Sequence, residues 1–103
     1  MLVGRWVLIE AMNVPLGSSL ATEVERFADG TVKAFFPGNS NPVYGNWSVS
    51  NGSITVIPHQ HTGEPTILNQ STNYFELSDN RLTLILDRDI GYIGIYELIV
   101  PGY

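Results

Sequence analysis

The hydrophobic residues of this chain alternate with polar residues in short runs, and each run is closed by glycine, asparagine, aspartate or proline. Alternation with a period of two is typical of β-strands, because successive side chains on a strand point to opposite faces. No stretch carries a helical stripe of useful length. The pattern therefore predicts an all-β protein.

Eight strands are expected from these runs. They cover residues 2–12, 20–27, 31–36, 43–49, 53–57, 66–77, 81–86 and 91–100, the sixth bulged or broken near 69–71. Asp29-Gly30 and Asn51-Gly52 are strong turn signals, because glycine supplies the positive φ that a tight hairpin needs. Consecutive hairpins at even spacing predict an eight-stranded antiparallel up-and-down β-barrel. A sandwich needs longer crossovers, which only residues 37–42 and 58–65 could supply.

The first strand carries apolar residues on both of its faces. If Trp6 points inward, alternation also places Gly4, Leu8, Glu10 and Met12 inside, with Val7 and Ile9 outside. The last strand likewise puts Ile93 and Ile95 outside, next to the first strand of a closed barrel. An outer apolar face of this size is more than a monomer usually exposes. It predicts a homodimer, or else a cover formed by a loop or by residues 101–103.

Charged residues on the inner face leave two alternatives open. If the Glu10 carboxylate lies in the interior, it needs either a partner such as Arg26 or a water-filled cavity. If it lies at an open rim of the barrel, it is solvated. On the second strand, an inward Phe27 brings Glu23 and Glu25 inside. An outward Phe27 instead brings in Arg26 together with Val24 and Thr22.

Composition narrows the partners that the chain can have. The 103 residues form a single domain, and the net charge is −5 with only five scattered basic residues, so no nucleic-acid partner is expected. Cysteine is absent, which excludes disulfides and thiolate chemistry. No run is apolar enough to span a membrane. Met1 leads directly into the first strand, which predicts a cytoplasmic protein, or one whose leader has been removed.

Several short motifs, taken in order, resemble those of lipocalins. Gly4-Arg5-Trp6 matches the G-x-W signature that opens lipocalins, and residues 27–32 (FADGTV) match the F-x-x-D-G-T turn of short bacterial lipocalin-like domains. Residues 44–49 (YGNWSV) with 51–56 (NGSITV) resemble their G-x-W-x-V hairpin, and residues 74–77 with 81–84 resemble the pair before the final strand. The resemblance implies a calycin-type barrel whose calyx binds a small apolar molecule.

The chain also departs from the lipocalin pattern. Lipocalins usually carry a basic residue late in the barrel that packs over the first-strand tryptophan, but residues 92–100 contain none. Arg88 is the possible substitute, or aromatic side chains pack this end. The chain is shorter than a typical lipocalin and lacks its flanking helix, so a small cavity is expected. Some relatives in the wider calycin-like group are enzymes, or have no known ligand.

We therefore expect a small hydrophobic or aromatic ligand in the barrel, with no cofactor. The residues expected to bind it are Trp6, Glu10, Phe36, Trp47, Tyr74 and Tyr96. Plain core packing of the aromatic residues is the alternative. A cofactor-free cyclase or isomerase is the second hypothesis, because a shaped pocket can hold a substrate near its reactive conformation. Its acid or base would be Glu10, His59, Tyr74 or Tyr96. An interaction module that uses the outer apolar face is the third hypothesis.

Other catalytic and metal sites have weak support in the sequence. His59 and His61 share a face of extended backbone and could hold a metal ion together with Glu64. Histidines in a polar loop are more often solvated or cap a turn, so no metal site is expected. No Gly-x-Ser-x-Gly elbow, P-loop or dinucleotide-binding glycine pattern is present.

Overall fold

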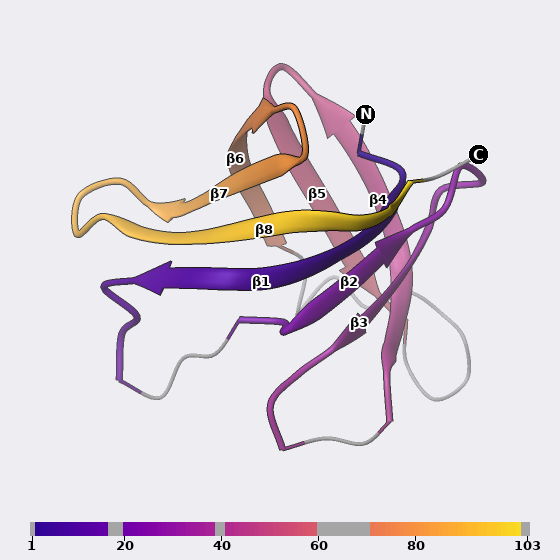
Figure 1. The fold of residues 1–103 in the computed structure, drawn as a ribbon, viewed down its shortest axis with the longest axis horizontal. Helices are drawn as coiled ribbons and strands as arrows, with labels where there is room; N and C mark the ends of the chain where they lie inside the picture. The colour runs from indigo at the N-terminus through magenta and orange to yellow at the C-terminus, as the bar shows by residue number, and fades with distance from the viewer. Residues whose placement is uncertain (1, 17–19, 39–40, 60–70, 102–103) are drawn as a thin grey trace.

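The computed structural model describes residues 2–16, 20–38, 41–59 and 71–101. Eight strands are found in this part of the chain: β1 (Gly4–Met12), β2 (Glu23–Arg26), β3 (Thr31–Phe35), β4 (Val43–Ser50), β5 (Ser53–Pro58), β6 (Ser71–Ser78), β7 (Arg81–Asp87) and β8 (Tyr92–Pro101). Each strand is antiparallel to the next, and β8 pairs with β1 to close the barrel (Figure 1). The predicted all-β, eight-stranded up-and-down barrel is confirmed.

The two ends of the barrel differ in their connections. At the end where β1 begins, which we call the closed end, tight turns join β2 to β3, β4 to β5 and β6 to β7. Gly30 (φ 91°) and Gly52 (φ 79°) have the positive φ expected of them. The Asp29 carboxylate also accepts a hydrogen bond from the Thr31 backbone N–H at 2.9 Å. At the other end, the open end, the connections after β1, β3 and β5 are longer.

Two tryptophans occupy the closed end. Trp6 is fully buried and its indole N–H donates to the Leu2 carbonyl at 3.0 Å. Trp47 packs partly buried against the core, and its indole N–H donates to the Phe27 carbonyl at 2.9 Å. The prediction that Trp6 points inward is therefore confirmed. The guanidinium of Arg88 lies 4.6 Å from the Tyr74 ring centroid, on the outer surface, so Arg88 does not pack over Trp6.

A bulge in β1 changes which residues face the interior. Leu8 pairs with Tyr96 but Glu10 pairs with Ile95, so Ile9 is an extra residue between them. Beyond the bulge, Glu10 and Met12 share the outer face with their partners on β8. The prediction that both point inward with Trp6 is wrong, because the extra residue Ile9 reverses the phase of alternation beyond it. Glu10 is exposed, in agreement with the alternative that its carboxylate is solvated.

A second bulge lies between the same two strands at the closed end. Arg5 pairs with Val100 and Trp6 with Leu98, which leaves Ile99 as the extra residue. Val100 consequently shares the outer face with Arg5, whereas uninterrupted alternation along β8 would place it on the inner face with Tyr96. The described residues contain no helix that is long and apolar enough to cross a membrane.

Candidate functional site

The barrel interior holds a partly enclosed cavity of about 310 Å³. Its lining is mostly apolar and comes from β2 to β8, together with residues that flank these strands. The lining residues are Leu20, Ala21, Val24, Arg26, Val32, Ala34, Phe36, Val43, Tyr44, Gly45, Ile54, Val56, Pro58, Ser71, Asn73, Leu84, Leu86 and Tyr96. Trp6 and Trp47 are not among them, so the cavity lies above the closed end and extends toward the open end.

Arg26 is the one charged side chain among these lining residues, and it lies at the floor of the cavity. It is the last residue of β2, beside Gly4 of β1 and Val32 of β3 at the closed end. The residue is only 3% exposed, and neither Nε nor Nη1 has a hydrogen-bond partner among the described residues. Burial lowers the pKa of Arg26 to about 10, because an apolar environment disfavours the charged form. The guanidinium therefore remains a cation at neutral pH.

The neighbouring carboxylates do not neutralise Arg26. Glu23 and Glu25 lie on the opposite face of β2, where Glu23 pairs with Arg5 at 2.9 Å. Among the described residues the ion pairs are this one and Arg81 with Glu97. The inward set on β2 is thus Val24 and Arg26, which decides between the two phases that the sequence left open. No ion pair joins Arg26 to Glu10.

Tyr96 is another polar side chain that lines the cavity, as Tyr44, Ser71 and Asn73 also do. Its hydroxyl donates to the Ala21 carbonyl at 2.7 Å, and the residue is 2% exposed. Burial raises the pKa of Tyr96 to about 12, and the Arg26 charge opposes part of that rise. Arg26 and Tyr96 both line the cavity, so the phenol and the guanidinium face the same interior. At neutral pH, Tyr96 is a neutral phenol whose proton is already shared with the backbone.

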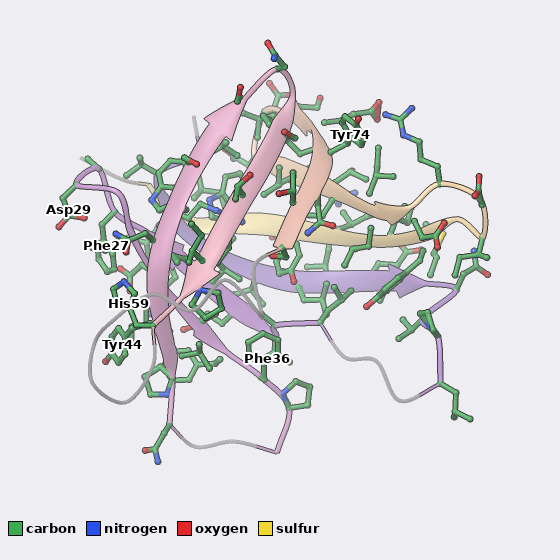
Figure 2. All side chains as sticks on the ribbon, turned by 180° about the vertical axis from the view of Figure 1, so that it is seen from behind. Phe27, Asp29, Phe36, Tyr44, His59 and Tyr74 are labelled. Atoms are coloured by element: carbon green, nitrogen blue, oxygen red, sulfur yellow. The ribbon has the colours of Figure 1, made fainter. Side chains whose placement is uncertain are left out.

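The structure separates the residues expected to bind a ligand. Phe36 and Tyr96 line the cavity, whereas Trp6 and Trp47 fill the closed end. Glu10 is exposed on the outer side of the bulge and does not line the cavity. Tyr74 is 53% exposed and pairs with Ile85 on the outer face. Figure 2 shows Tyr74 projecting away from the barrel, on the opposite side from Tyr44 and His59.

His59 belongs to an exposed polar cluster that does not line the cavity. Its imidazole Nε2 hydrogen-bonds with the Asn46 side-chain oxygen, and its backbone N–H donates to the Tyr44 carbonyl at 2.8 Å. Asn46 in turn donates to the Gly30 carbonyl at 3.4 Å. His61 and Glu64, the other members of the possible metal set, lie outside the described residues. Within the described ranges, no group of three potential ligands comes together.

Arg26 was missed as a binding residue, although the sequence contains a signal for it. The alternation of β2 must bury either Arg26 or the two carboxylates Glu23 and Glu25. Burying one cation costs less than burying two like charges, which is a physical reason to prefer the arginine phase. The Asp29-Gly30 turn then pairs Arg26 with the apolar Val32, which places a charged residue on an apolar face.

Comparisons with protein-family models, curated proteins and solved structures find no significant match to this chain. The lipocalin resemblance therefore stays a prediction, which the barrel neither requires nor contradicts.

Proposed function

We propose that this protein binds a small hydrophobic or aromatic molecule inside its barrel. The observation that carries the proposal is the cavity of about 310 Å³, with a wall that is apolar except at a few points. Its volume is at the lower end of the range for small-molecule pockets, which suits a ligand of one or two rings or a short chain. A calyx of this kind is also what the resemblance to short bacterial lipocalin-like domains implies.

Isothermal titration calorimetry with a panel of small apolar compounds tests the proposal. Calorimetry is preferable to intrinsic fluorescence, because neither Trp6 nor Trp47 borders the cavity. Ala34 lines the cavity, so Ala34→Phe is expected to fill part of it and to abolish binding. Ala28 is exposed in the turn between β2 and β3, and Ala28→Phe is the matched control that keeps wild-type affinity. Absence of binding heat across the panel, or unchanged binding by Ala34→Phe, contradicts the proposal.

A cyclase or isomerase that acts in the same cavity is the second hypothesis. Of its four candidate acid or base residues, Tyr96 alone lines the cavity. Its proton is shared with the Ala21 carbonyl and its pKa is raised to about 12, far from the neutral range in which an acid–base group works best. These two observations favour binding over proton transfer.

A further inference from the structure

We infer that the ligand carries a single carboxylate, which Arg26 binds at the floor of the cavity while the apolar wall holds the rest of the molecule. The inference rests on the proposed function and names the chemical class of its ligand. It starts from a buried cation two of whose three nitrogens have no hydrogen-bond partner among the described residues.

A buried cation without a partner is unusual in a folded protein. Charged groups are rarely buried unless they are paired, and buried N–H donors are nearly always hydrogen-bonded. Arg26 departs from both rules, since it is 3% exposed and its Nε and Nη1 have no partner among the described residues. Such a departure inside a cavity points to a group that enters from solution.

The described part of the chain offers no counter-charge in the interior. The carboxylates nearest in sequence, Glu23 and Glu25, face outward beside Arg5. Of the ten acidic residues of the chain, Glu64 alone lies outside the described ranges. Glu64 is therefore the residue that a test has to separate from an external anion.

The surroundings of Arg26 select one class of anion. One guanidinium balances one negative charge, so a carboxylate leaves the interior neutral, whereas a doubly charged phosphate leaves an excess negative charge buried. The planar guanidinium also matches the geometry of a carboxylate.

The test compares acids with neutral alcohols of the same shape. Octanoate with octanol, and naphthoate with naphthalenemethanol, are titrated into the full chain by calorimetry at neutral pH. Wild-type protein is expected to bind each acid at least about 30-fold more tightly than its alcohol, the range for a buried charge pair. Arg26→Met should lose that preference while it still binds the alcohols, and Arg26→Lys should keep part of it.

Three controls separate the explanations. Arg5→Met removes a cation from the outer face and should leave the acid preference unchanged, because Arg5 does not line the cavity. Glu64→Gln should change acid affinity by less than about twofold. The melting temperature of Arg26→Met should be no lower than that of the wild-type protein, because the variant removes an unpaired buried charge.

The outcomes distinguish the inference from the proposed function. Equal affinity of the wild-type protein for acid and alcohol overturns the carboxylate inference and leaves the cavity as a binding site. A gain in acid affinity of 30-fold or so on Glu64→Gln also overturns it, because Glu64 would then be the resident counter-charge. If neither member of either pair binds, the proposed function itself fails. The wild-type comparison does not depend on the folding of any variant.

Discussion

At the residue scale, the pKa values of Arg26 and Tyr96 are shifted in opposite directions by the same cause. Burial lowers the pKa of Arg26 and raises that of Tyr96, because in each case the apolar interior disfavours the charged form. The guanidinium charge partly offsets the rise at Tyr96, since it stabilises a phenolate. The two groups therefore report on the polarity of the same interior, and either one can be used to measure it.

The phenol titration of Tyr96 is the direct measurement. We expect one tyrosine to ionise at a pH of about 12, and the corresponding step in phenolate absorbance should be missing in Tyr96→Phe. The unfolded chain releases this proton near its ordinary pKa of about 10, so deprotonation favours unfolding as the pH rises from about 10 to about 12.

Circular dichroism recorded along the titration shows whether the fold persists over this range. A folded protein in which every tyrosine ionises near pH 10 would contradict the burial of Tyr96. The pH dependence of unfolding is a poorer measure of the burial of Tyr96 than the phenol titration. The lowered pKa of Arg26 changes the stability in the opposite direction. As the pH rises, the folded chain loses the Arg26 proton before the unfolded chain does, and the folded state then no longer buries that charge.

At the scale of elements, the turns follow from the sequence and the bulges do not. Asp29-Gly30 and Asn51-Gly52 specify their hairpins, because only glycine and a few polar residues adopt a positive φ at low conformational energy. The extra residues Ile9 and Ile99 carry no such mark, being apolar like their neighbours. Their positions depend on how β8 must shear against β1 to close the barrel, which is a property of the whole sheet. The phase of Trp6 is therefore predictable, but that of Glu10 is not.

Gly45 shows how closely β4 and β5 approach, and it supports the next prediction. A Cβ atom at this position would lie 2.6 Å from the Ile57 carbonyl oxygen and 3.0 Å from the Pro58 Cα, both of them backbone atoms. Gly45→Ala is therefore expected to destabilise the protein by about 1–3 kcal/mol, as measured by denaturant unfolding. Ser48→Ala, at an exposed position of the same strand, should stay within about 0.5 kcal/mol of wild type. Equal stability of both variants would show that the strands can separate at Gly45 without loss.

At the scale of the whole molecule, the candidate site is only partly predictable. That an eight-stranded barrel either fills itself or holds one small ligand follows from its diameter. Which of the two occurs depends on where the large side chains lie along the axis. Trp6 and Trp47 both lie at the closed end, and small residues such as Ala34 and Gly45 line the cavity. Sequence spacing does not give these axial positions, because they depend on the stagger between strands.

The outer face of the barrel carries an apolar row that crosses four strands. Met12 pairs with Ile93, Ile93 with Ile85, and Ile85 with Tyr74. Val7, in contrast, pairs with the charged Glu97, so the row is displaced from the position that simple alternation predicts. The C-terminal residues 101–103 are one of the covers that the sequence suggests for the outer apolar face. They begin at Pro101, which pairs with Gly4 at the opposite end of β1 from Met12. Met12 and Tyr74, at the two ends of the row, are exposed, and Ile85 and Ile93 between them are half-buried.

We predict that a second copy of the chain covers this row. Light scattering at micromolar concentration should give twice the chain mass of 11.4 kDa. Ile93→Glu places a carboxylate at the centre of the row and should give the monomer mass, because the dimer would have to bury that charge. Ser48 is exposed on the outer face of β4, away from the row, so Ser48→Glu is the control and should remain dimeric. A monomeric wild-type protein would contradict the prediction, and loss of the dimer in both variants would place the interface elsewhere.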